Sequence, residues 1–262
     1  MEEVRVSSWP ELQEQLFTGA WRPELGRFRS NFAFRGRNDV AEDLRTSLLR
    51  LGGNPREVEA HLLRNFRRYA QHEDVPFDSP WNWLALAQHH GLPTRLLDWT
   101  HSPLVALHFA TARLEHYDRD GIVWMVDYVE AQKHTPEQLR SVLEEQAMVV
   151  FTAELLDDAA GGVAALESLA DDDYVVFLEP PSLNERIVNQ YSLFSLMSRP
   201  EVRLDAWLES RPHLGRRVVI PAELKWEVRD KLDQSNVTER VLFPGLDGLS
   251  RWLARYYAPR GE

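Results

Sequence analysis

Two arginines lie close together near the start of the chain, in the stretch NFAFRGRND at residues 31–39. If this stretch is an extended strand, its side chains alternate between the two faces, which places the phenylalanines on one face and Arg35 and Arg37 on the other. A guanidinium group can donate two parallel hydrogen bonds to a planar anion. The pattern therefore predicts a core strand that presents a pair of anion-binding groups on either side of Gly36.

A second polar group lies in the stretch TRLLDWT, residues 94–100, between two segments that look like buried helices. If the stretch is extended, Thr94, Asp98 and Thr100 share one face. If it is a helical turn, Arg95 and Asp98 are neighbours and can form an ion pair. Buried polar groups need hydrogen-bond partners or a ligand. The segment is therefore either a structural Arg95–Asp98 bridge that joins the two helices, or the polar wall of a pocket beside the arginine strand.

Histidines cluster in the same part of the chain, at His89, His90, His101 and His108. A metal site would need three or four of them to converge with a carboxylate such as Asp98. Adjacent histidine side chains point in different directions, and a histidine inside an apolar helix is usually a hydrogen-bonded core residue. We therefore expect no metal ion, and we count His89 and His90 among the pocket residues.

Caps and periodicity predict the elements that must hold these groups in place. Serines that precede proline-containing first turns predict helix starts, and apolar runs rich in β-branched residues predict buried strands. The segment 183–197 has an asparagine cap, Asn184, near its start, and the residues after it fit either a helix or a strand. The predicted helices are 9–17, 40–53, 55–72, 80–90, 103–112, 222–236 and 246–257, and the predicted strands are 31–36, 121–128, 174–181 and 216–221.

The strands are scattered among the helices without a regular β-α-β alternation. This order predicts an α+β fold with a mixed, mostly antiparallel sheet flanked by helices. The 44% hydrophobic content is enough for a large core, and we expect one domain over residues 1–262. Residues 130–173, where small residues lie between acidic clusters, are predicted to be a peripheral insertion.

Composition narrows the function classes. The formal net charge of -11 disfavours non-specific nucleic-acid binding, although it does not exclude a local basic pocket for a small nucleotide. The chain has no cysteine, so disulfides, thiolate nucleophiles and zinc-cysteine sites are excluded. A phosphate-binding glycine loop, a dinucleotide fingerprint and a glycine-flanked nucleophilic serine are also absent. With no signal-like start and no apolar run of membrane-spanning length, we expect a soluble, cytoplasmic protein that does not bind membranes.

Longer blocks around these residues resemble the FRG domain family. The tripeptide FRG stands at 34–36, and the block WLALAQHHGLPTRLLDWTHSPLVALHFA follows at 83–110. Two further blocks at 184–196 and 243–253 look like the family's C-terminal blocks. The chain departs from the pattern at Ser192, where family members commonly have glycine.

At the level of fold, the layout of these blocks is similar to that of ADP-ribosyltransferases. The resemblance implies that a basic strand holds NAD, a middle polar segment shapes the pocket, and a late residue contacts the ribose and assists transfer. Here the late residue would be Gln190, or failing that Glu185, acting with Arg35 as the catalytic set. The resemblance implies that Arg35 and Gly36 bind NAD and that Thr94, Asp98 and Thr100 shape the pocket. The full expected binding set is Arg35, Gly36, Arg37, His89, His90, Thr94, Arg95, Asp98 and Thr100.

Three hypotheses follow from this reading. The first is an NAD-consuming ADP-ribosyltransferase or NAD glycohydrolase, with NAD as substrate and a macromolecular acceptor whose class the sequence does not specify. The second is a non-catalytic module that binds a nucleotide or a nucleic acid. The third is a structural role, in which Arg35 is buried and paired with Asp98 as a bridge in the core.

Overall fold

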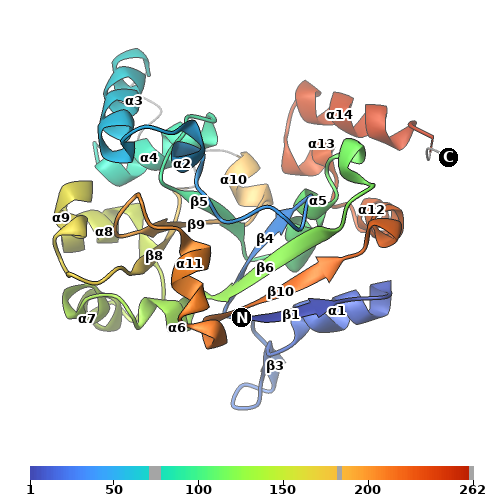
Figure 1. Ribbon diagram of the computed structural model, residues 1–262, viewed down its shortest axis with the longest axis horizontal. Coiled ribbons are helices and arrows are strands. Elements are labelled where there is room, and N and C mark those ends of the chain that lie inside the picture. The colour runs from blue at the N-terminus through green and yellow to red at the C-terminus, as the bar shows by residue number, and fades with distance from the viewer. Residues whose placement is uncertain (71–77, 182–184, 260–262) are drawn as a thin grey trace.

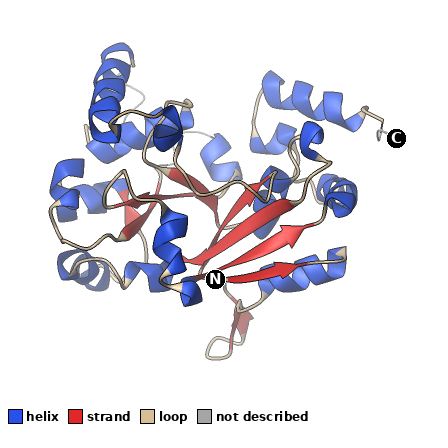
Figure 2. Ribbon diagram, viewed as in Figure 1, coloured by secondary structure: helices blue, strands red, loops and turns tan. Residues whose placement is uncertain are grey.

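The computed structural model describes residues 1–70, 78–181 and 185–259, and it has an α+β architecture in which helices surround one mixed sheet (Figures 1 and 2). Within these residues the sheet order is β1-β10-β6-β4-β5-β9-β8-β7. The outer pairs β1–β10 and β7–β8 are parallel and the other pairs are antiparallel, which confirms the predicted sheet. The strands are β1 (Glu2–Arg5), β4 (Phe32–Arg37), β5 (Leu97–Thr100), β6 (Gly121–Asp127), β7 (Phe151–Thr152), β8 (Val175–Glu179), β9 (Ser192–Met197) and β10 (Gly215–Ile220).

The helices begin where the capping residues predict. Ser8, Ser79 and Ser102 each accept a hydrogen bond from a backbone N–H of the first turn.

No helix in the described ranges combines the length and the apolarity that a membrane crossing requires. A separate two-stranded hairpin is formed by β2 (Trp21–Arg22) and β3 (Arg27–Phe28). The helices are α1 (Trp9–Phe17), α2 (Ser47–Leu51), α3 (Pro55–Tyr69), α4 (Pro80–His89), α5 (Pro103–Ala110), α6 (Tyr128–Gln132), α7 (Glu137–Glu145), α8 (Ala153–Ala160), α9 (Val163–Glu167), α10 (Glu185–Asn189), α11 (Leu204–Glu209), α12 (Lys225–Gln234), α13 (Glu239–Leu242) and α14 (Leu246–Tyr256).

Two predicted elements differ from the structure. Helix 40–53 is wrong over most of its length, because only α2 is helical and Thr46 caps its first turn by accepting from the N–H of Leu49. Upstream of that cap, Asp43 accepts a hydrogen bond from the N–H of Arg45, a local bond that competes with a helix. The ambiguous segment 183–197 contains both alternatives, α10 followed by β9, and its proposed asparagine cap lies outside the described residues.

Residues 130–173, for which a peripheral insertion was expected, form α7, α8, α9 and β7 at one end of the sheet. Apolar side chains from this stretch, including Leu143, Phe151 and Leu156, belong to the same buried cluster as Leu84 of α4 and Leu196 of β9. The stretch therefore supplies the far edge of the sheet and part of the core under it.

The sheet consists of two halves that barely touch. β4 pairs with β6 along its whole length, and β5 pairs in the same way with β9. Between β4 and β5 the register contains a single pair, Phe34 opposite Thr100. The strands of the two halves run in visibly different directions (Figure 2). Past that single pair β4 and β5 must separate, because no further backbone pairing holds them together.

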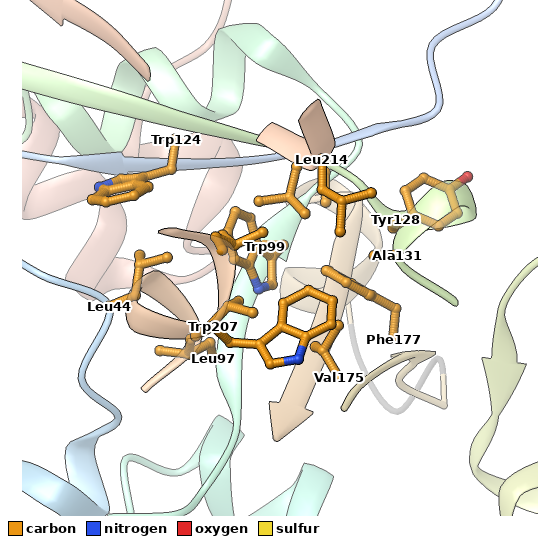
Figure 3. Close-up of a cluster of buried hydrophobic side chains, with 14 of the residues drawn as sticks. Leu44, Leu97, Trp99, Trp124, Tyr128, Ala131, Val175, Phe177, Trp207 and Leu214 are labelled. Carbon is orange, nitrogen blue, oxygen red and sulfur yellow. The ribbon is translucent and has the colours of Figure 1, made fainter. Parts of the chain in front are cut away.

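Trp99 holds the second half in place. Its ring lies in the cluster of buried apolar side chains drawn in Figure 3, 6.0 Å from the ring of Phe177, and its Nε1 donates to Ser195 Oγ at 2.8 Å. Because side chains alternate along a strand, Asp98 and Thr100 point to the face opposite Trp99. The burial of one tryptophan therefore directs two polar side chains towards the line where the halves separate.

Gly36 sets the distance between β4 and α5. A Cβ atom added at Gly36 would lie 1.8 Å from the carbonyl oxygen of Ala106 and 2.7 Å from the backbone nitrogen of Ala110. Such distances are far shorter than any real contact, so the helix can pack here only against a residue without a side chain. The glycine of the FRG tripeptide is therefore a packing requirement for the buried helix α5.

We predict that Gly36→Ala lowers the free energy of unfolding by about 2–3 kcal/mol, because α5 must move away from β4. Urea denaturation measures this change. Gly162→Ala is the control, since a Cβ there meets nothing within 4 Å, and it should cost less than about 1 kcal/mol. Equal stability of the two variants would contradict the packing argument.

Glu59 is the buried residue of α3, whereas Tyr69 at the end of the same helix is 79% exposed. The Glu59 carboxylate accepts from the backbone N–H and from Nε of Arg95, at 3.0 and 2.6 Å.

We predict that Glu59→Gln lowers the free energy of unfolding by about 3 kcal/mol, because Arg95 loses a buried counter-charge. Glu57→Gln, on the exposed face of the same helix, should change it by less than about 1 kcal/mol in the same urea titration. A similar effect of both variants would show that the buried pair is not important for stability.

Candidate functional site

A cavity of about 210 Å³ opens where β4 and β5 separate. It brings together three segments that are far apart in the chain: the arginine strand, the TRLLDWT segment and the end of α10. Six of the predicted site residues line this cavity: Arg35, Gly36, Arg37, Asp98, Thr100 and Gln190. Its wall also contains Gln88, Phe109, Arg186 and Ser192, which the sequence did not predict as site residues.

Arg35 bridges the two halves of the sheet. Its Nη1 donates to the backbone carbonyl oxygen of Asp98 at 2.5 Å and lies 3.8 Å from Asp98 Oδ2. A side chain of β4 thus bonds a carbonyl of β5 where backbone pairing has ended. Only 14% of the Arg35 side chain is exposed, and burial lowers its pKa, which the charge of Asp98 partly opposes. Within the described residues, its Nε is buried without a hydrogen-bond partner.

Arg37 is the second guanidinium of the cavity. It forms an ion pair with Glu42, and its Nε also has no partner among the described residues. Burial, followed by the neighbouring charge of Arg35, lowers the pKa of Arg37 to about 9. Two partly desolvated cations, each with an unpaired N–H, favour the binding of an anion between them.

Asp98 is held in place by Gln88, another residue of the cavity wall. Gln88 Nε2 donates to Asp98 Oδ2 at 2.7 Å, and Thr94 Oγ1 donates to Gln88 Oε1 at 2.5 Å. Thr94, a predicted pocket residue, is fully buried and does not line the cavity, but it supports the wall through Gln88. The polar side chain of Gln88 at the end of an apolar helix was the sequence signal for its role.

Arg95 does not form the predicted bridge with Asp98. The helical-turn alternative is wrong, because Leu97–Thr100 is a strand. The Arg95 side chain is 3% exposed and binds Glu59 at 2.6 Å and Glu167 at 2.9 Å, outside the cavity lining. The structural bridge therefore exists, but it joins TRLLDWT to α3 and α9.

Gln190 and Glu185, the two candidates for the residue that contacts the ribose, occupy different places. Gln190 lines the cavity, but its side-chain Nε2 donates to the backbone carbonyl oxygen of Leu242 at 2.8 Å. The backbone carbonyl oxygen of Gln190 accepts from the Thr100 hydroxyl. Glu185 is exposed and lines a separate hollow of about 440 Å³ with His89 and Arg186. Gln190 therefore ties α10 to α13 at the cavity rim, and Glu185 lies outside the cavity.

The histidines do not converge. His89 is half-buried, and burial, then the charge of Arg186, lower its pKa to about 4. His90 is exposed at the end of α4, and neither residue lines the 210 Å³ cavity. Among the residues that the structure describes, no group of three or more histidines and carboxylates is placed to hold a metal ion.

A larger hollow of about 630 Å³ adjoins the cavity and shares Gly36, Arg37 and Phe109 with it. Arg113, Phe243 and Arg251 contribute to its wall. The guanidinium of Arg251 lies 4.6 Å from the centre of the Phe243 ring. The two spaces therefore share part of a wall, and the larger one has cationic and aromatic side chains.

His108 lines this larger hollow and is 1% exposed. Its Nδ1 lies 2.8 Å from Arg229 Nη1, and burial, then the charge of Arg229, lower its pKa to about 3. The folded protein therefore binds this proton less readily than the unfolded chain, and stability falls as the pH drops from about 6.5 towards 3. Glu239, whose pKa is lowered from about 4.5 to about 2, adds to this loss of stability only below about pH 4.5.

We predict that His108→Gln removes up to about 1.4 kcal/mol per pH unit from the slope of unfolding free energy between pH 6.5 and 4.5. Glutamine can accept from Arg229 but does not titrate. Urea titrations at pH 7, 6 and 5 measure both slopes. An unchanged slope in the variant would contradict a neutral, buried His108.

Comparison with known proteins identifies one family. Residues 30–119 match the FRG domain family. No curated protein and no solved structure matches the chain. The matched segment contains β4, α4, β5 and α5, and so both walls of the split in the sheet, whereas α10 and Gln190 lie beyond it. The segment 30–119 is therefore similar to the FRG domain family, and the tripeptide FRG at 34–36 within it supplies Arg35 and Gly36 to the cavity.

Proposed function

We propose that this FRG domain binds NAD and cleaves its nicotinamide–ribose bond, transferring ADP-ribose to water or to a macromolecular acceptor. The observation that carries the proposal is the cavity at the split of the sheet. Its wall contains two mostly buried guanidiniums, Arg35 and Arg37, and each has an Nε without a hydrogen-bond partner among the described residues. The Arg35 guanidinium lies 3.8 Å from the carboxylate of Asp98. This set suits a ligand that carries a pyrophosphate next to a ribose that becomes cationic during the reaction.

The sizes of the spaces support a dinucleotide. A cavity of about 210 Å³ is smaller than the usual volume of a site for a whole cofactor, but it suits a nicotinamide and its ribose. The adjoining hollow of about 630 Å³ would receive the ADP half, with Phe109 and Phe243 available for contact with the adenine ring. Arg37 belongs to both walls and would bind the pyrophosphate between them.

The chemistry needs positioning and electrostatics from the protein. The bond between ribose C1′ and the nicotinamide nitrogen breaks, the electron pair leaves with nicotinamide, and positive charge develops on the ribose. A hydroxyl of water or of the acceptor then bonds to C1′ and releases its proton. Fixed charges around the ribose favour this path, because they stabilise the developing positive charge without having to reorganise.

A second candidate is a nucleotide-binding module without turnover. The positions of Gln190 and Glu185 favour this candidate. The side-chain amide of Gln190 donates to the carbonyl oxygen of Leu242 rather than into the cavity, and Glu185 lies outside the cavity. Such a module would bind NAD or another nucleotide, with an affinity that falls as salt rises, and would release no nicotinamide.

We predict that purified protein releases nicotinamide from labelled NAD, alone or with cell extract as acceptor source, and that Arg35→Gln lowers kcat/KM by about 100-fold, equivalent to about 2.7 kcal/mol of transition-state binding. Arg27→Gln is the control, since Arg27 is exposed on the separate hairpin. Binding of NAD without release would support the second candidate. If Arg35→Gln instead loses most of its thermal stability, the arginine is a structural bridge.

A further inference from the structure

We infer that Asp98 is the catalytic carboxylate of this cavity and that Gln88 positions it. The assignment rests on the proposed function and replaces the late residue as the group that faces the ribose. Among the described residues that line the 210 Å³ cavity, Asp98 is the only carboxylate. Its side chain is 58% exposed, so it is open to a ligand rather than enclosed in an ion pair.

The two oxygens of Asp98 have different environments. Oδ2 accepts from Gln88 Nε2 at 2.7 Å and lies 3.8 Å from Arg35 Nη1. In the part of the chain that the structure describes, Oδ1 makes no hydrogen bond. One oxygen is therefore held in place, while the other is free to accept from a ribose hydroxyl or to face developing positive charge.

Thr94 determines which way the Gln88 amide points. The Thr94 hydroxyl accepts from the N–H of Leu96 at 3.1 Å and has one proton, which it donates to Gln88 Oε1 at 2.5 Å. With its oxygen bound to Thr94, Gln88 must present its NH₂ group to Asp98. Thr94 is fully buried, so solvent does not compete for this bond. The chain Thr94–Gln88–Asp98 thus orients the carboxylate from the core outward.

This arrangement provides what the proposed bond cleavage needs. A carboxylate near ribose C1′ stabilises the oxocarbenium-like centre as nicotinamide leaves with the bonding electron pair. The Arg35 guanidinium donates to the backbone carbonyl oxygen of Asp98. The group that would bind the dinucleotide therefore also sets the position of Asp98. The incoming hydroxyl attacks C1′, and its proton goes to solvent.

The test compares kcat, KM and the pH profile of NAD cleavage in three variants of the full chain. Asp98→Asn should lower kcat by at least about 100-fold and change KM by only a few fold, because a ground-state hydrogen bond is retained while the charge is lost. Gln88→Glu places a second carboxylate within hydrogen-bond distance of Asp98. The pair then retains a proton to higher pH, and the acid limb of kcat/KM should move upward by about one pH unit or more.

Asp118→Asn, an exposed carboxylate outside the cavity, is the matched control and should behave as the unmodified protein does. Melting temperatures within a few degrees of the unmodified protein show that the variants fold. If the unmodified protein cleaves NAD and Asp98→Asn retains its kcat, or if Gln88→Glu leaves the pH profile unchanged, the assignment is overturned and the proposed function stands. If the unmodified protein does not cleave NAD, both are overturned.

Discussion

The single backbone pair between β4 and β5, Phe34 opposite Thr100, is the constraint on which the site depends. Each strand is fully paired on its other side, β4 with β6 and β5 with β9, so each half of the sheet is continuous up to the split. Backbone groups that face the gap must then find other partners. Arg35 meets part of this need by donating to the carbonyl of Asp98. The split in the sheet therefore produces both the space of the cavity and its first charged group.

The packing on either side of the split keeps it open in one geometry. On the β4 side, the absence of a side chain at Gly36 lets α5 lie directly on the strand. On the β5 side, the buried ring of Trp99 orients the strand so that Asp98 and Thr100 face the gap. Core packing is dense and allows little adjustment, so these contacts limit how far the two strands can move relative to each other.

Buried arginines in this chain differ in how completely their hydrogen-bond donors are paired. Arg95 is paired with two carboxylates, Glu59 and Glu167, and this complete pairing is that of a structural ion cluster. Arg35 and Arg37 are also mostly buried, but each retains an N–H without a partner in the described residues. Desolvation without full pairing is costly, and such groups are typical of sites that await a ligand. Arg229 also has a buried Nε without a partner in the described residues, but it does not line the 210 Å³ cavity. The candidate site is therefore distinguished by the cavity next to Arg35 and Arg37, and not by the unpaired N–H groups alone.

The sequence by itself determined the elements whose signals are local. Serine caps, the alternation in NFAFRG and the apolar runs placed α1, α4, α5, β4 and β6, because caps and periodicity act over a few residues. The tertiary structure alone decided the partners of charged groups, since an arginine can pair with any carboxylate that the fold brings near. Thus Arg95 pairs with Glu59 rather than Asp98, Glu185 lies outside the cavity, and Gln88 orients Asp98 through contacts that depend on how a helix end meets a strand.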